Sequence, residues 1–156
     1  MIEPRRLRPP RQRAGLLNYI IVIVRFQMPQ DRFSGAEADE FGREFGRRIA
    51  AAIGAEMLRT TSNECLLNGE RMVIKCARKR TQSVGVSYKM MERIKAVLGA
   101  FEQDDGSYAI WKLSVERYSR LARPSVASGA AVAGKLGQVE KARFEREGDL
   151  VGTVRP

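Results

Sequence analysis

The sequence of 156 residues contains no histidine, only two cysteines and a single tryptophan. Without histidine, the chain lacks the side chain that ordinarily titrates near neutral pH, which excludes histidine-based acid–base catalysis, Ser-His-Asp triads and histidine-ligated metal sites. Two cysteines cannot build a zinc site within one chain. Any bound metal must therefore be held by carboxylates, carbonyls and water, which are the ligands that suit Mg²⁺ or Mn²⁺.

Long apolar runs are also scarce. Residues 16–24 (L-L-N-Y-I-I-V-I-V) form the one strongly apolar segment, which is too short to cross a bilayer and is interrupted by Asn18. Arginines precede it, but no small-residue cleavage site follows, so we predict a β-strand or an unstructured leader rather than a signal peptide. Met28 is an alternative initiator, which would place residues 1–27 outside the native protein. We expect no membrane association and a cytoplasmic location with reduced cysteines.

Basic residues are abundant, with 28 lysines and arginines against 18 acidic residues, a net charge of +10 and a sequence pI of about 10.2. Such a balance favours a polyanionic partner, because neutralising phosphates releases condensed counterions. We expect nucleic acid as the partner, with DNA favoured, and a homodimer is left open. The alternative is a soluble basic protein without such a partner. The length and the 44% hydrophobic content predict one domain with a sizeable core.

Asn68-Gly69 lies between two apolar runs and predicts a two-residue β-hairpin turn, because both residues adopt positive φ readily. This register predicts a core face with Cys65, Leu67, Met72, Ile74 and Cys76. The opposite face carries Glu64, Leu66, Arg71, Val73 and Lys75. Glu64 and Lys75 are then diagonal neighbours on adjacent strands, roughly 7–8 Å apart at the backbone. The two cysteines share a face but lie too far apart along the ribbon for a disulfide.

Helical periodicity and capping signals predict helices near residues 34–54, 87–93, 114–122 and 140–147. Strands are predicted at 56–61, in the two arms of the hairpin, in the second half of 94–101 and at 108–113. This order predicts an α/β fold, with α+β as the alternative, built on a mixed central sheet flanked by helices. We divide the chain into a basic arm with room for an extra strand (1–33), a core (34–123), and a Gly/Ala-rich loop with a charged C-terminal helix whose last residues fray (124–156).

The order helix, strand, hairpin, helix, strand over residues 34–121 resembles the core of the PD-(D/E)XK nuclease superfamily, the restriction-endonuclease-like fold. In that family an acid begins the second strand, an (E/D)-x-K triplet lies on the third, and the first helix often adds a glutamate. The resemblance implies that Glu64 is the strand acid, Lys75 the motif lysine, and Glu44, or less readily Glu40, the helix acid. This chain departs from the motif at Val73, where the second acid belongs.

The resemblance implies a Mg²⁺- or Mn²⁺-dependent endonuclease that hydrolyses phosphodiester bonds in DNA. Glu64 and Glu44 would be metal ligands, and Lys75 would act with Glu64 as a catalytic residue that positions the attacking water. The basic residues would contact phosphates: Arg71, Arg78, Lys79 and Arg80.

Two other classes of function fit the sequence. The first is a nucleic-acid-binding module of the same fold that is catalytically silent because of Val73. The second is a basic assembly subunit that pairs its apolar 16–24 segment with the sheet edge of a partner. For the charged residues themselves, the structural alternatives are a surface cross-strand pair at Glu64 and Lys75 and a solvated helix charge at Glu44.

Overall fold

In the computed structural model, residues 32–125 and 134–156 are described, with side chains described from residue 37 onward within those ranges. This part of the chain contains both helices and strands. The helices are α1 (Arg32–Ile53), α2 (Tyr88–Met91), α3 (Val115–Leu121) and α5 (Lys141–Glu147). The strands are β1 (Glu56–Met57), β2 (Glu64–Leu67), β3 (Glu70–Ala77), β4 (Ser83–Ser87), β5 (Ala96–Glu102), β6 (Tyr108–Ser114), β7 (Arg123–Pro124), β8 (Leu136–Glu140) and β9 (Asp149–Val154).

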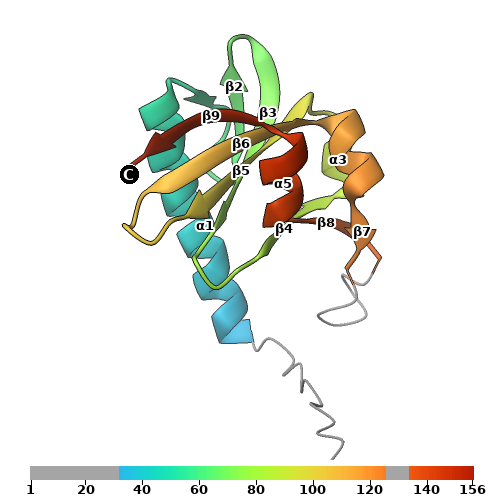
Figure 1. Cartoon of the computed structure of the whole chain (residues 1–156), viewed down its shortest axis with the longest axis horizontal. Coiled ribbons are helices and arrows are strands. Elements are labelled where there is room, and N and C mark those ends of the chain that lie inside the picture. Colours follow the sequence, from blue (N-terminus) through green and yellow to red (C-terminus); the bar gives the residue numbers. More distant parts are fainter. Residues whose placement is uncertain (1–31, 126–133) are drawn as a thin grey trace, which may run out of the picture.

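The described strands form two sheets (Figure 1). The larger has the order β1-β2-β3-β5-β6-β9, in which β3 and β5 run parallel and every other pair is antiparallel. The smaller is antiparallel, with the order β4-β8-β7. A parallel pair needs a long crossover connection, and β4 with α2 supplies it between β3 and β5. The predicted mixed sheet with flanking helices is therefore confirmed.

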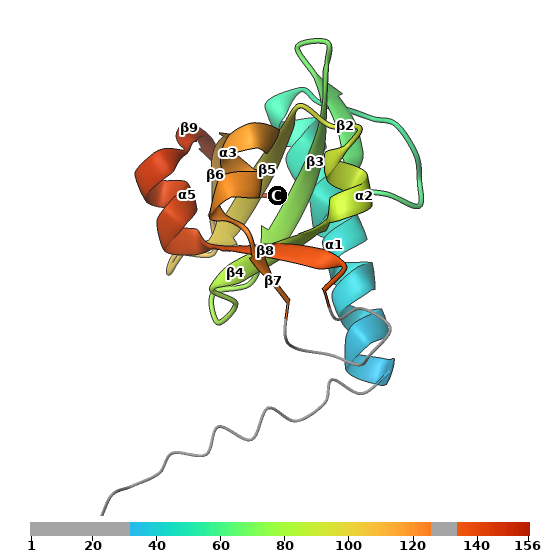
Figure 2. The ribbon, with the colours of Figure 1, turned by 90° about the vertical axis from the view of Figure 1, so that its right-hand side faces the viewer.

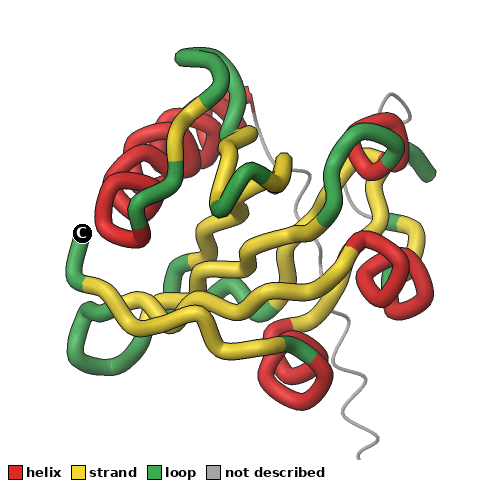
Figure 3. Tube along the Cα trace, turned by 90° about the horizontal axis from the view of Figure 1, so that it is seen from above, coloured by secondary structure: helices red, strands yellow, loops and turns green. Residues whose placement is uncertain are grey.

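Both faces of the larger sheet are covered, because side chains of β5 point alternately into two separate cores. Ala96, Leu98 and Ala100 pack with α1, whereas Val97 and Phe101 pack with α3, α5 and the smaller sheet. Figure 2 shows α1 on one side of the sheet and α3 with α5 on the other, and Figure 3 shows the same separation from above. A strand buried on both faces reads as a continuous apolar run, as A-V-L-G-A-F does.

The hairpin has the predicted register. Asn68 and Gly69 form its tip with φ of 53° and 77°, and Glu64 lies opposite Val73. The assignment of its second face to a non-core surface was wrong, however, because Val73 is fully buried and Glu64 is only 2% exposed. Val73 packs in the core that contains β4, α3 and α5. The cysteines are free, as predicted.

Serine caps begin two of the predicted helices. The hydroxyl of Ser87 accepts a hydrogen bond from the backbone N–H of Met90 (3.2 Å), and that of Ser114 accepts one from Arg117 (3.2 Å). Such caps accept hydrogen bonds from backbone N–H groups of the first turn, because these groups have no carbonyl partner within the helix. The predicted start of the first helix at Ser34 was wrong by two residues, since α1 already begins at Arg32.

Five strands differ from the predictions. The first strand is only two residues long, and β4, β7 and β8 were not predicted. The C-terminal residues do not fray, because β9 pairs with β6 at the edge of the larger sheet. The strands β4, β8 and β9 pair with strands far away in the chain, which a local pattern does not reveal.

Three further sequence predictions concern the ends of the chain and membranes. Residues 1–31 of the basic arm, including the apolar segment 16–24, lie outside the described residues, and so does most of the Gly/Ala-rich loop, whereas the last two residues of the predicted arm, 32–33, belong to α1. Within the described ranges, none of the helices is both long enough and apolar enough to span a bilayer.

Candidate functional site

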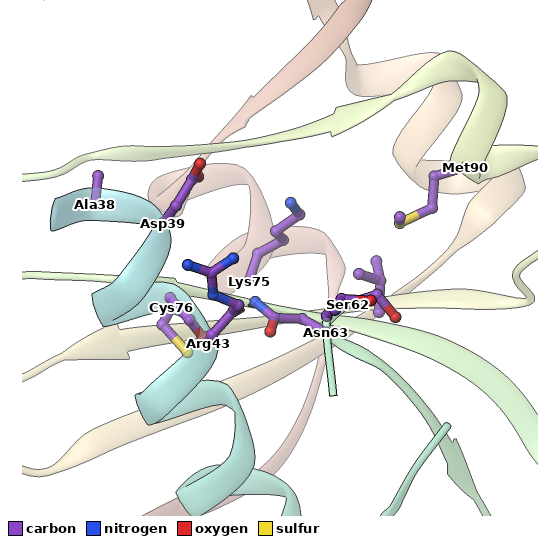
Figure 4. Close-up of a pocket in the computed structure, with 11 residues that line it drawn as sticks. Ala38, Asp39, Arg43, Ser62, Asn63, Lys75, Cys76 and Met90 are labelled. Carbon is purple, nitrogen blue, oxygen red and sulfur yellow. Dashed lines mark hydrogen bonds between the residues drawn. The ribbon is translucent and has the colours of Figure 1, made fainter. Parts of the chain in front are cut away.

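A cavity of about 370 Å³ lies where α1 passes the end of β3. Its wall includes Asp39 and Arg43 from α1, Asn63 from the loop before β2, Lys75 from β3 and Met90 from α2 (Figure 4). The cavity exists because β2 begins only at Glu64 while β3 continues to Ala77, so the last residues of β3 have no β2 partner on that edge.

Asn63 fixes the loop against α1 beside this cavity. Its side-chain amide donates to the carbonyl oxygen of Gly42 (3.0 Å), and its backbone carbonyl accepts from the N–H of Ile74 (2.9 Å). The approach is close: a Cβ at Gly46 would lie 3.1 Å from Asn63 Oδ1, so a glycine one turn after Gly42 makes room for the amide. Asn63 Oδ1 is buried and accepts no hydrogen bond from the residues that the structure describes.

Lys75 brings a half-buried ammonium group to the cavity. No carboxylate of a described residue lies within ion-pairing distance of it. Burial lowers the pKa of Lys75, because the charged form loses hydration, and the neighbouring carboxylate of Asp39 opposes this effect. A cation that is partly dehydrated and lacks a close counter-ion is prepared to bind an anion.

Arg43 adds a second cation to the same wall. It lies one helical turn after Asp39, so both side chains extend from one side of α1 toward the cavity (Figure 4). Arg43 is exposed, and its guanidinium makes no hydrogen bond or ion pair with the described residues. The cavity wall thus carries two cations and one carboxylate, which favours an anionic ligand.

Glu64 lies on the same face of the hairpin as Lys75 but is not part of the cavity wall. Its carboxylate accepts from Arg93 Nη2 (2.6 Å) and Nε (3.2 Å) and from Arg71 Nε (2.8 Å), and Arg71 Nη2 lies 2.6 Å away. The hydrogen bonds from Arg93, together with those from Arg71, lower the pKa of Glu64 although burial opposes the shift. The carboxylate is therefore ionised and fully engaged by two guanidinium groups.

Glu44, the predicted helix acid, lies elsewhere on α1. It forms an ion pair with Arg48 one turn later, its side chain is half exposed, and it does not contribute to the cavity wall. Glu40 is exposed and is likewise absent from the wall. The structure thus does not bring Glu44, Glu64 and Lys75 together, and only Lys75 reaches the cavity.

The residues around the cavity do not fit a Mg²⁺ or Mn²⁺ site. Among the described residues, Asp39 is the one carboxylate on the wall, whereas these ions prefer several oxygen ligands in a near-octahedral arrangement. Across residues 37–125 and 134–156, no three Asp, Glu or Cys side chains are grouped so that they could hold a metal ion. Val73, where the family motif has its second acid, is apolar and buried.

The four predicted phosphate contacts differ in their availability. Arg71 is held by Glu64, and Lys79 pairs with Asp104 (2.8 Å) while its backbone N–H donates to Glu102. Arg78 stacks over the ring of Phe41 and is exposed. Arg80 is exposed and makes no polar contact with the described residues. Arg78 and Arg80 are therefore the members of this set that remain open to a ligand.

Three residues of the cavity wall were missed from the sequence: Asp39, Arg43 and Asn63. The helical spacing of Asp39 and Arg43 indicates one helix face, but on an amphipathic surface helix such a pair is ordinarily solvated. The pair of Asp39 and Arg43 faces a cavity only because α1 crosses the end of β3. No protein-family model, curated protein or solved structure matches this chain.

Proposed function

We propose that this domain is a nucleic-acid-binding module that takes a backbone phosphate at the cavity of Lys75 and does not hydrolyse it. The observation that carries the proposal is the pair of cations, Lys75 and Arg43, on one cavity wall with a single opposing carboxylate. Asn63 lies beside these cations on the same wall, and the hydroxyl groups of Thr61 and Ser62 extend it with donors of the kind that bind phosphate oxygens.

The charge of the whole molecule supports the same proposal. A net charge of +10 attracts polyanions over distance, and the exposed Arg78 and Arg80 follow Lys75 along the chain. The order α1, β1, β2–β3 hairpin, α2, β5 follows the element order on which the restriction-endonuclease-like resemblance rests, except that β4, a strand of the smaller sheet, is inserted between β3 and α2. We therefore propose a catalytically silent relative of that fold, in which Glu64 has become a structural anion between two arginines.

The metal-dependent nuclease is the less favoured of the two functions, because Glu64 is bound by two arginines and Glu44, paired with Arg48, is not on the cavity wall that holds Lys75. A basic assembly subunit with an acidic protein as its partner is a third alternative. All three make different predictions about DNA binding, about its dependence on metal and about the fate of the DNA.

The test is fluorescence anisotropy with labelled oligonucleotides in EDTA, repeated with Mg²⁺ and Mn²⁺, followed by a gel of the recovered DNA. We expect micromolar binding that weakens steeply with salt, does not need metal and leaves the DNA intact. Lys75→Met should weaken binding about tenfold, since it removes a charge-assisted contact. The matched control is Lys95→Met, which removes the same charge from an exposed lysine outside the cavity.

Three results would overturn the proposal. Cleavage of the DNA that is abolished by a chelator would make the metal-dependent nuclease the favoured function. Absence of DNA binding, with binding to an acidic polypeptide instead, would favour the assembly subunit. Equal losses for Lys75→Met and Lys95→Met would mean that net charge, and not the cavity, determines affinity.

A further inference from the structure

The guanidinium of Arg78 lies over the first ring of an aromatic row on α1. Its guanidinium carbon is 4.3 Å from the centre of the Phe41 ring, a distance that corresponds to a stacked cation–π contact. Phe41 in turn contacts Phe45 (4.4 Å between ring centres), and Phe45 contacts the buried Tyr108 (5.5 Å). The row is thus anchored in the core at Tyr108, and Arg78 is exposed at its outer end.

The stacked pair adjoins the cationic cavity on two elements. On α1, Phe41 lies one turn after Ala38, which belongs to the cavity wall. On the other side, Arg78 follows Cys76, a further wall residue, by two positions. A planar, partly apolar surface and an anion-binding wall therefore lie next to each other.

We infer that the Phe41–Arg78 pair is a stacking platform for an unpaired nucleobase whose phosphate binds at Lys75 and Arg43. The inference rests on the proposed function and specifies its ligand as single-stranded nucleic acid. A guanidinium plane held over an aromatic ring offers its second face to a base, and every base has a π-face that can stack there. In a duplex those faces are covered by neighbouring base pairs, so only an unpaired base can use the platform.

The test compares three DNA probes of equal length by fluorescence anisotropy: a single strand, the same strand with abasic sites throughout, and a duplex. The abasic strand keeps the phosphates but has nothing to stack. We expect the single strand to bind about tenfold more tightly than the abasic strand, within the range measured for base–aromatic stacking. The duplex should bind no more tightly than the abasic strand at matched phosphate number.

Two variants connect the preference to the platform. Arg78→Lys keeps the charge but removes the planar group, so it should abolish the preference for the single strand while leaving the salt dependence unchanged. Arg80→Lys is the matched control, because Arg80 makes no ring contact among the described residues, and it should leave the preference intact. Phe41→Leu should act like Arg78→Lys, with circular dichroism to establish that it is folded. Should Phe41→Leu unfold, the Arg78→Lys and Arg80→Lys pair still decides the question.

The outcomes separate this inference from the proposed function. Equal binding of the single strand and the abasic strand, with both still dependent on Lys75, would overturn the platform alone. A single-strand preference that survives in Arg78→Lys would do the same. If the wild-type protein shows no DNA binding that depends on Lys75, the proposed function itself is overturned.

Discussion

Two charged residues on one face of the β2–β3 hairpin, Glu64 on β2 and Lys75 on β3, differ in how their charges are satisfied. Glu64 is buried and is bound by Arg71 and Arg93, so all its hydrogen-bonding capacity serves the fold. Lys75 lies further along the same face, half-buried at a cavity and without a close counter-ion among the described residues. A charge that is fully paired within the protein stabilises it, whereas one left unpaired beside a cavity is available to a ligand.

Val73 lies between the two charges on this face and gives the largest expected effect. Val73→Glu places a carboxylate at a fully buried position in an apolar core, so it should lower the free energy of unfolding by more than about 3 kcal/mol. Urea denaturation measures the loss, and Val73→Ala is the control that separates lost volume from buried charge. A Val73→Glu variant of wild-type stability that binds Mg²⁺ would restore the metal-site interpretation.

At the Glu64 end, replacement by glutamine should lower the free energy of unfolding by about 1.5–3 kcal/mol at neutral pH, because it removes hydrogen bonds to two charged groups. The folded-state pKa of Glu64 is lowered, so its contribution is complete above its ordinary value of 4.5 and is lost as the pH falls through the folded-state pKa. Denaturation curves between pH 7 and pH 3 should therefore converge for wild type and Glu64→Gln. A difference that is constant over this range would mean that the ionised carboxylate is not the stabilising species.

At the Lys75 end, replacement by methionine should change the free energy of unfolding by less than about 1 kcal/mol at pH 7. Burial lowers the folded-state pKa of Lys75, so the unfolded chain binds the proton more tightly and the wild type gains stability as the pH rises toward 10.5. The difference between wild type and Lys75→Met isolates this gain, since the other alkaline groups are common to both. A wild type that loses stability relative to Lys75→Met over this range would contradict the assignment.

The smallest effects are expected in the basic loop, where Lys79 forms an ion pair and its neighbour Arg80 forms none with the described residues. Arg80→Ala should reduce the salt dependence of DNA binding by about one phosphate contact. Lys79→Ala should change it less, because Lys79 already pairs with Asp104 and would have to exchange one anion for another. Anisotropy titrations at several salt concentrations measure both slopes, and a larger change for Lys79→Ala would reverse this ranking.

The sequence predicts the hairpin well because its determinants are local. Asn68-Gly69 specifies the turn, and alternation then places every residue from Glu64 to Lys75 on its correct face. The burial of Glu64 is not predictable in this way, because its partner Arg93 is 29 residues away and lies just beyond α2. The same reason explains the missed strands β8 and β9, whose partners are distant in the chain.

The candidate site was predictable only in part. Lys75 was identified from its position on the hairpin, but its surroundings depend on where α1 crosses β3 and on the close approach of Asn63 to Gly42. Helical spacing places Asp39 and Arg43 together without showing what they face. A family resemblance assigned metal-binding roles to Glu64 and Glu44 instead. The pair of Glu44 with Arg48 is local to α1, whereas the pairing of Glu64 with Arg93 became visible only in three dimensions.

The most direct test of the comparison is the dissociation constant of one single-stranded oligonucleotide for Glu64→Gln and Lys75→Met, measured at a temperature where both variants are folded. We predict that Lys75→Met weakens binding about tenfold, whereas Glu64→Gln stays within about twofold of the wild type. A Glu64→Gln variant that loses binding while Lys75→Met retains it would contradict the account, because it would make Glu64 the ligand-binding end of the strand face.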